Sequence, residues 1–386
     1  MDEFRYVAYA QEIIFAPNSL ARLGEAVERF GWRRLLLCTS RSLRASGHVD
    51  FVESILGDTL VAEFDHVQPH VQDVQVNEVF ALAVDKNIDA VLGMGGGSPI
   101  GMAKAVSFAL QAKRTGYPAR AAFPTDQPLV PVIAIPTTYA GSEMTPMYGV
   151  THTDEVPPRK VTVNDPMIAP KLVIYDPELT INLPPGMTAS TGINALAHCI
   201  EALYSKTHNP LSTTAATSGV SHIFNALLNC YQQGNNLEDR TEMLLGAHLA
   251  GLSLASVSMG LHHGLCHVLG GSANIPHGIA NSIILPHAIR FNADVTAPQL
   301  LPAAEAMGIP VNRINPIVVN EAMVQKIFHL IGQMNLPQRL RDAGVGLRED
   351  ELPNLAQLAF QNRTVQNNPI PITGAEQIEQ LLMDAW

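Results

Sequence analysis

Gly260-Leu-His-His-Gly-Leu-Cys-His-Val-Leu-Gly-Gly271, followed by Asn274-Ile-Pro-His-Gly278, is the stretch from which the organisation of the chain can be read. It places four of the fourteen histidines within sixteen residues: His262, His263, His267 and His277. If residues 261–269 are helical, His263 and His267 share a face, and the double glycine is a natural helix stop. Pro276 suits the first turn of a new helix, which would direct His277 to the same point.

Two interpretations of these histidines are open. A single histidine is usually a core residue or a helix cap. Three imidazoles brought together by a helix, a double-glycine turn and a helix start favour a functional site instead.

The composition indicates a globular protein of two domains. The chain has 386 residues, of which 47% are apolar and 15% charged, enough to bury two cores. The net charge of −11 and the lack of a basic stripe argue against a nucleic-acid partner. A small anionic substrate needs only a local cationic pocket and is still allowed.

Cysteines and apolar segments bear on the compartment. Four cysteines stand far apart, which predicts reduced thiols in a cytoplasmic protein rather than a zinc ribbon or disulfides. The first residues lack the apolar core of a signal peptide. Residues 243–261 carry no formal charge and could span a membrane by length, but serines, glycines and His248 favour a buried central helix. We expect no membrane partner.

The first half of the chain alternates between strand and helix patterns. Short apolar runs at 34–38, 90–93 and 130–135 are typical of buried parallel strands, and residues 74–86 have a helical pattern. This predicts an α/β nucleotide-binding domain over residues 1–182.

Two loops of this half are candidates for cofactor binding. Gly95, Gly96, Gly97 and Ser98 follow a strand and precede Pro99, as in a turn whose helix N-terminus holds a pyrophosphate. Ser98 stands where the usual fingerprint has its third glycine, so a plain tight turn is the alternative. Thr137, Thr138 and Ser142 follow another strand, at the end where ligands bind, although such loops are often only polar turns. We also count Lys160 among the candidates.

The second half, residues 183–386, is predicted to be helical. Pro184-Pro185-Gly186 resembles a linker. The following helix, residues 188–204, carries Asn194 and His198 on one face. With His263 and His277 they form a four-ligand set of the kind that holds metals in helical domains.

Five motifs together resemble the iron-containing alcohol dehydrogenase superfamily. They are Gly95-Gly-Gly-Ser98, Pro136-Thr-Thr138, Asp176-Pro-Glu-Leu-Thr180, Thr191-Gly-Ile-Asn-Ala-Leu-Ala-His198 and Pro276-His-Gly-Ile-Ala-Asn281. The resemblance implies the fold shared with dehydroquinate synthase: an N-terminal α/β dinucleotide-binding domain, an all-helical C-terminal domain and an active site in the cleft between them. It also implies that an aspartate and three histidines hold a divalent metal, at the positions of Asn194, His198, His263 and His277.

Within this superfamily the chain resembles the maleylacetate reductase branch. The resemblance rests on Tyr139-Ala-Gly-Ser-Glu-Met-Thr-Pro146, on Asn194 in place of the aspartate, and on the histidine stretch. It implies NADH- or NADPH-dependent reduction of maleylacetate to 3-oxoadipate in aromatic degradation, without a required metal because the asparagine lacks the carboxylate charge. We expect a homodimer in which His198, His263 and His277 stabilise the enolate and His267 donates a proton.

Two other functions are kept open. A metal-dependent alcohol or aldehyde dehydrogenase would tolerate Asn194 as a ligand, and Pro276-His-Gly-Ile-Ala-Asn281 is closer to that class. A catalytically silent nucleotide-binding protein is the third. For the cofactor, the strand at 34–38 ends in Thr39-Ser40-Arg41. Thr39 and Ser40 can bond a ribose or a phosphate and no carboxylate repels a 2′-phosphate, so we expect that both NADH and NADPH are used.

Overall fold

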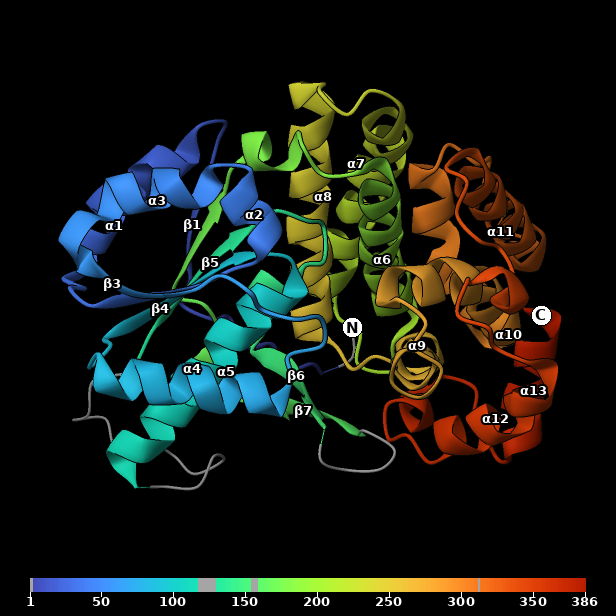
Figure 1. Cartoon of the computed structure of the whole chain (residues 1–386). Coiled ribbons are helices and arrows are strands. Elements are labelled where there is room, and N and C mark those ends of the chain that lie inside the picture. Colours follow the sequence, from blue (N-terminus) through green and yellow to red (C-terminus); the bar gives the residue numbers. More distant parts are fainter. Residues whose placement is uncertain (1–2, 117–129, 154–158, 312) are drawn as a thin grey trace. The chain divides into compact units, whose positions relative to one another are not determined.

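The computed structural model describes residues 3–116, 130–153, 159–311 and 313–386, and its contacts divide the chain into two compact units (Figure 1). The α/β unit comprises Ala8–Thr138 and Ser142–Ile181, and the helical unit comprises Met1–Val7, Tyr139–Gly141 and Asn182–Trp386. The sequence placed residues 139–141 in the first domain. They belong to the helical unit because Arg240 donates to the Tyr139 hydroxyl and because Gly141 packs on the backbone of Gly251.

A six-stranded parallel sheet forms the centre of the α/β unit. Its strand order is β1-β8-β5-β4-β2-β3, with bounds β1 Glu12–Phe15, β8 Leu172–Tyr175, β5 Val132–Pro136, β4 Ala90–Gly95, β2 Leu35–Cys38 and β3 Leu60–Phe64. The chain leaves β2 toward β3 on one side and returns to β4 on the other. The carboxyl ends of β2 and β4 therefore flank a switch point, where ligands bind in such sheets.

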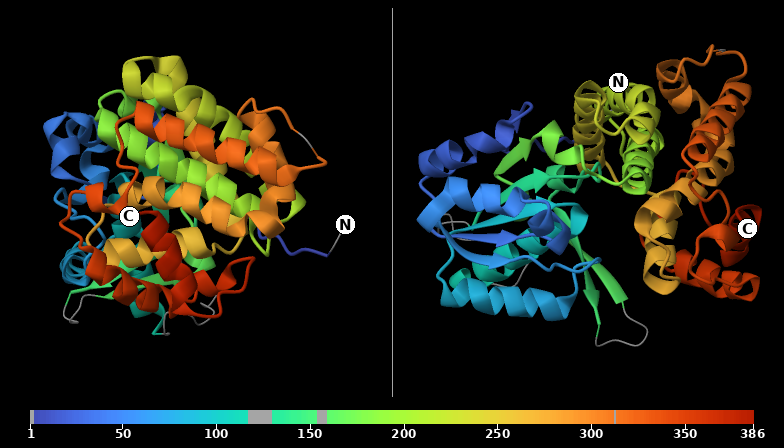
Figure 2. Two further views of the ribbon diagram at one scale, coloured as in Figure 1. Left: turned by 90° about the vertical axis from the view of Figure 1, so that its right-hand side faces the viewer. Right: turned by 45° about the horizontal axis from the view of Figure 1, so that its top comes forward.

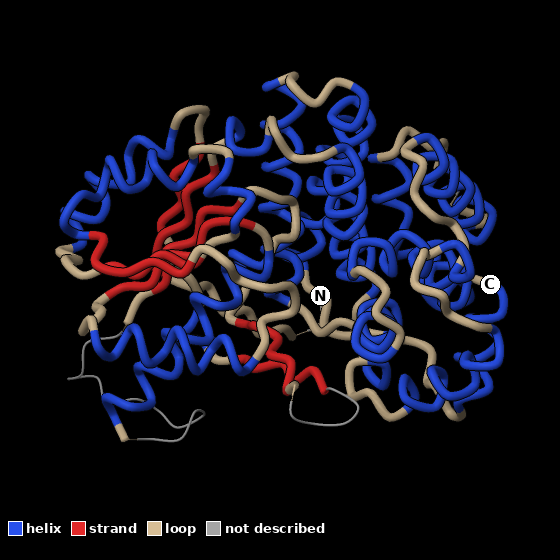
Figure 3. The backbone as a smooth tube through the Cα atoms, in the orientation of Figure 1, coloured by secondary structure: helices blue, strands red, loops and turns tan. Residues whose placement is uncertain are grey.

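Alternate side chains of the strands enter two cores. Leu35, Leu37 and Leu92 pack with α1 (Leu23–Phe30) and α3 (His48–Leu56) on one face. Leu36 and Val91 pack with α4 (Asp73–Asp85) and α5 (Gly97–Thr115) on the other. Figure 3 shows the strands in red between these helices. The expected α/β architecture is confirmed, with element bounds shifted by one or two residues.

An antiparallel ribbon extends the α/β unit. It consists of β6 (Met147–His152) and β7 (Arg159–Asn164). Thr151 of the ribbon donates its N–H to Val71 and its hydroxyl to His70, so the ribbon is fastened to the loop that precedes α4.

The helical unit confirms the all-helical prediction for the second half. It contains α6 Pro185–Tyr204, α7 Pro210–Gln232, α8 Leu237–Ser256, α9 Leu261–Ser272, α10 His277–Ala306, α11 Pro316–Gln333, α12 Leu352–Phe360 and α13 Ala375–Asp384. Helices α6, α7 and α8 lie side by side (Figure 2). One apolar core joins α9 and α10 to α12 and α13.

Three details of the helical unit differ from the prediction. Pro185 is the first residue of α6 rather than part of a linker, since proline is compatible with a helix start. Residues 243–261 are not one helix, because α8 ends at Ser256 and α9 begins at Leu261. Gly270-Gly271 lies inside α9, which continues to Ser272, and Asn274 takes the left-handed conformation (φ 56°) instead.

In the described part of the chain, no single helix combines the length and apolar character needed to cross a membrane. By the same two criteria one bent pair of described helices passes, α8 with α9, at 101° to each other.

Gly93 allows β4 and α5 to approach each other closely. A Cβ atom on Gly93 would lie 2.8 Å from Ile100 Cα and 2.9 Å from Pro99 O, whereas one on Gly97 would have no heavy atom within 4 Å. We therefore expect Gly93→Ala to lower the free energy of unfolding by about 1–3 kcal/mol, and Gly97→Ala to leave it nearly unchanged. Urea denaturation checks both, and equal stability of the two variants would contradict the close packing.

Candidate active site

One face of α6 supplies three buried polar side chains. Asn194, His198 and Glu201 are spaced i, i+4 and i+7, so they lie in one row along the helix. All three are buried, and Glu201 is fully inaccessible. Asn194 and His198 were predicted from the sequence, and Glu201 was not.

The structure brings the predicted histidines of α6, α9 and α10 together. The rings of His198 and His263 stack at a centroid distance of 4.5 Å and an interplanar angle of 15°. His277, the first residue of α10, lies 6.4 Å from His263 and 5.6 Å from His267. His198, His263, His267 and His277, with Asn194, are called the histidine cluster below.

Close packing of α10 on α6 holds His277 near this cluster. A Cβ atom on Gly278 would lie 2.7 Å from Ser190 Cβ and 2.9 Å from Ser190 O. The glycine after His277 therefore lets the start of α10 touch the first turns of α6.

Glu201 joins α6 to the start of α9. Its Oε1 accepts the N–H groups of Gly260 (3.0 Å) and His262 (3.1 Å). Its Oε2 accepts the N–H of His263 (3.3 Å) and contacts His263 Nδ1 at 2.5 Å. Burial raises the pKa of Glu201, and the nearby His262 and these backbone N–H groups oppose that rise.

Burial also favours the neutral form of two of these imidazoles. It holds the pKa of His198 and of His263 well below the usual value, and neighbouring histidines lower both further. Within the cluster, three buried atoms find no hydrogen-bond partner among the described residues: Asn194 Oδ1, His198 Nδ1 and His263 Nε2. The cluster thus keeps polar capacity available for a ligand.

The charge of the four residues at the superfamily's ligand positions shows whether they fit its divalent metal. Asn194, His198, His263 and His277 carry no formal negative charge, because residue 194 is an amide. The carboxylate of Glu201 is already engaged by the start of α9 and by His263. A dication would therefore lack a compensating anion in its coordination shell, and the set does not fit a tightly held divalent metal.

The glycine-rich turn lies at the end of β4, as predicted. Gly95 has φ 142°, which favours glycine, and its carbonyl accepts the N–H of Thr137. A Cβ on Gly96 would lie 3.3 Å from the Thr138 side chain. Gly97 begins α5, and the Ser98 hydroxyl accepts the N–H of His70 at 3.2 Å. These predicted residues thus lie close together at the carboxyl ends of β4 and β5.

Thr39 and Ser40 differ in accessibility. Thr39 is fully buried and donates its hydroxyl to Met94 O at 2.9 Å, so its proton is not available to a ribose and the expectation for this side chain is corrected. Ser40 precedes α2 (Arg41–Ala45) and its hydroxyl contacts only Ser42 among the hydrogen bonds described. Ser40 remains the candidate at this strand end.

Ser142 is held by a buried lysine. Lys104 of α5 donates to the carbonyl groups of Ser142 (2.6 Å), Thr145 (2.7 Å) and Met147 (3.0 Å). Burial lowers the pKa of Lys104 to about 7, and the charge of Glu143 opposes this shift. Lys104 thereby ties α5, which starts at the glycine-rich turn, to the loop after β5.

Lys160 is on β7, where its backbone pairs with Thr151; its side chain lies outside the described part of the structure. His70, whose carbonyl group accepts the hydroxyl of Thr151 in the ribbon, donates its N–H to the Ser98 hydroxyl. His70 itself has φ 68° and Val71 φ 43°, a conformation that is costly for a β-branched residue.

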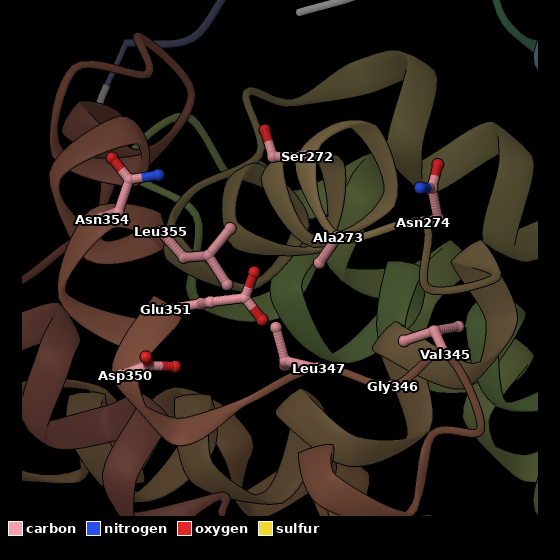
Figure 4. Close-up of a pocket in the computed structure, with 10 residues that line it drawn as sticks. All are labelled: Ser272, Ala273, Asn274, Val345, Gly346, Leu347, Asp350, Glu351, Asn354 and Leu355. Carbon is pink, nitrogen blue, oxygen red and sulfur yellow. The ribbon is translucent and has the colours of Figure 1, made fainter.

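A cavity of about 340 Å³ lies elsewhere in the helical unit (Figure 4). It is lined by Ser272, Ala273, Asn274, Val345, Gly346, Leu347, Asp350, Glu351, Asn354 and Leu355. The two acidic side chains of this cavity already accept hydrogen bonds from Arg348. Asp350 accepts from the Arg348 side chain, and Glu351 accepts from the Arg348 backbone N–H. It includes no predicted site residue.

Comparisons with known proteins give one family for the whole chain. Residues 10–177 match the family described as iron-containing alcohol dehydrogenase, and residues 188–386 match the C-terminal part of the Fe-containing alcohol dehydrogenase family. The maleylacetate reductase of Pseudomonas knackmussii is 33% identical over 351 residues, 91% of this chain and 89% of the relative. The maleylacetate reductase of Burkholderia cepacia is 34% identical over 372 residues, which are 96% of this chain and 95% of that relative.

A solved structure agrees with these relatives. The crystal structure of maleylacetate reductase from Agrobacterium tumefaciens matches with a TM-score of 0.83 at 31% identity, and the match covers 100% of this chain and 99% of that one.

Proposed function

The chain belongs to the iron-containing alcohol dehydrogenase family, and we propose that it is an NAD(P)H-dependent reductase of maleylacetate or of a closely similar unsaturated keto-diacid. The observation that carries the proposal is the histidine cluster with a buried amide, Asn194, where the superfamily has a carboxylate ligand. Relatives named maleylacetate reductase match over almost the whole chain.

The chemistry of this reaction explains what the cluster has to supply. Hydride addition to a C=C bond conjugated with a carbonyl leaves an enolate, which needs stabilisation and then a proton. His198, His263 and His277 provide the polar groups for the enolate oxygen. The buried, neutral state of His198 and His263 suits this task because fixed dipoles stabilise developing charge most strongly where water is excluded.

His267 is the proposed proton donor. Its ring stacks on His277 at 5.6 Å and is half-buried, whereas His198 and His263 are buried. A ring that reaches both the cluster and the solvent can be reprotonated between turnovers.

The proposal extends to partners and compartment. We propose a homodimer in the cytoplasm that acts on a small anionic molecule, without nucleic-acid or membrane partners. The net charge of −11 supports the absence of a nucleic-acid partner.

One observation favours the metal-dependent dehydrogenase as a second candidate. Asn194 Oδ1 and His263 Nε2 are buried atoms with no partner among the described residues, and both can offer a lone pair to a cation. The missing carboxylate charge weighs against this candidate.

We expect the purified protein to oxidise both NADH and NADPH when maleylacetate is supplied. No acidic side chain follows β2 directly, so the two specificity constants should differ by a factor of only about ten to a hundred, or about 1.4–2.8 kcal/mol. The loss of reduced-nicotinamide absorbance measures both, with short aldehydes as comparison substrates. Activity on aldehydes alone would favour the second candidate, and a preference for NADH above about a thousandfold would show that another group excludes NADPH.

Activity should survive thorough chelation, because the cluster lacks a carboxylate for a dication. Asn194→Asp adds that carboxylate and should raise the affinity for Zn²⁺ by at least about tenfold in calorimetric titration. Asn225→Asp makes the same charge change on the exposed side of α7 and is the control. Loss of the unmodified protein's activity on chelation, with recovery on adding metal, would overturn the metal-free proposal.

His267→Ala should lower kcat by about 10²- to 10⁴-fold, the usual range for a positioned proton donor, and should leave the Kd for NADH nearly unchanged. His329→Ala removes an exposed histidine of α11 and serves as the control. Steady-state kinetics and cofactor fluorescence measure the two quantities. A loss in kcat below about threefold would assign the proton to water or to another group.

A further inference from the structure

We propose that Glu201 is the positioning residue of the histidine cluster: it caps α9 from α6 and holds the ring of His263 so that Nε2 faces the ligand. The kinetic consequence rests on the proposed function, whereas the ring geometry does not depend on the substrate.

The start of α9 needs hydrogen-bond acceptors that its N-cap residue does not provide. Its N-cap residue, Gly260, has no side chain, and a Cβ there would lie 3.2 Å from Asn368 Cα and 3.3 Å from Glu201 Oε1. Glu201 accepts the N–H groups of Gly260, His262 and His263 instead, at 3.0, 3.1 and 3.3 Å. Asn368 Oδ1 accepts the remaining N–H of this turn, that of Leu261, at 3.4 Å. A carboxylate at a helix N-terminus also interacts favourably with the helix dipole.

The same carboxylate determines which nitrogen of His263 carries the proton. Nδ1 lies 2.5 Å from Glu201 Oε2, and an ionised carboxylate only accepts hydrogen bonds. Nδ1 must therefore be the N–H group of the neutral ring. Nε2 keeps a lone pair and is buried without a partner among the described residues.

His262 supports this assignment independently. Its Nε2 lies 3.4 Å from the carbonyl oxygen of Asn281, which can only accept, so the proton of His262 belongs on Nε2. Its Nδ1 is then an acceptor, 3.1 Å from His263 Nδ1. Two acceptors, Glu201 Oε2 and His262 Nδ1, thus face the same atom of His263, and that atom is the donor.

This arrangement revises the role expected for His263. With Nδ1–H donated to Glu201, the neutral ring offers an acceptor to the ligand, and the N–H donors toward an enolate come from His198 and His277. Glu201 thus acts on the reaction through His263 and does not itself touch the substrate.

Glu201→Gln is the informative substitution. If the amide oxygen of the glutamine keeps the bonds to Gly260 and His262, its NH2 group faces His263 Nδ1 and donates to it. We expect the proton of His263 then to move to Nε2, at the cost of the hydrogen bond that Nδ1 donates to His262 Nδ1 in the unmodified protein. The opposite orientation would set the NH2 group against two N–H donors and is disfavoured.

The ring can be observed without substrate. Long-range ¹⁵N–¹H spectra of ¹⁵N-histidine-labelled protein distinguish protonated from unprotonated ring nitrogens, and loss of signals in His263→Gln assigns the residue. We expect Nδ1–H in the unmodified protein and Nε2–H in Glu201→Gln. The control is Glu242→Gln, which alters a half-exposed Glu–His pair of the same unit (His222 Nδ1 to Glu242 Oε2, 2.6 Å) and should leave His263 unchanged.

Kinetics with maleylacetate then test the consequence. Glu201→Gln should reduce kcat by about 10- to 100-fold, as loss of an orienting partner typically does, with little change in the KM for NADH, and Glu242→Gln should match the unmodified enzyme. Nε2–H in the unmodified protein would overturn the proposal, even if Glu201→Gln fails to fold. So would an unchanged kcat in a folded Glu201→Gln. A protein with the expected ring state but no activity on maleylacetate would instead refute the proposed function alone.

Discussion

The capping of α9 by a carboxylate from α6 is the contact on which the histidine cluster depends. Gly260 has no side chain to cap the helix, and a Cβ atom there would lie only 3.2 Å from Asn368 Cα and 3.3 Å from Glu201 Oε1. The N–H groups of the first turn of α9 therefore need an acceptor from elsewhere. Because Glu201 lies one turn after His198 on the same face, the bond that completes α9 also brings His263 against His198. One carboxylate therefore both caps the N-terminus of α9 and sets the geometry of the histidine cluster.

The charge of the cluster follows from that use of Glu201. A buried carboxylate is costly unless its lone pairs are engaged, and here both oxygens accept N–H groups. It is consequently not available to a cation in the site. With an amide at position 194, the cluster contains no anionic side chain. Such a site stabilises charge through oriented N–H dipoles, which suits an enolate that exists only during the reaction.

The sequence predicted those features that depend on local pattern. Apolar runs located β2, β4 and β5, and the histidine spacing located the cluster. Glu201 was missed although it lies seven residues after Asn194, because a glutamate in an apolar helix carries no sign of its distant partner. Thr39 was misjudged because a strand end does not show which way a hydroxyl points, and here it bonds Met94. Gly270-Gly271 did not stop α9, because glycine permits a left-handed turn without requiring one and Asn274 makes it instead.

The corner proposed to select the cofactor involves two neighbouring strand ends rather than one. Thr39 donates its N–H to Phe64 O, so Asp65 at the end of β3 lies beside the Thr39-Ser40 corner. Its carboxylate is bound by the guanidinium of Arg44 at 2.9 Å, and Arg44 also binds Glu53 and Glu63. A carboxylate paired in this way repels a 2′-phosphate less than a free one would. If this corner holds the cofactor as proposed, releasing Asp65 from Arg44 would leave an unpaired carboxylate there and would favour NADH over NADPH.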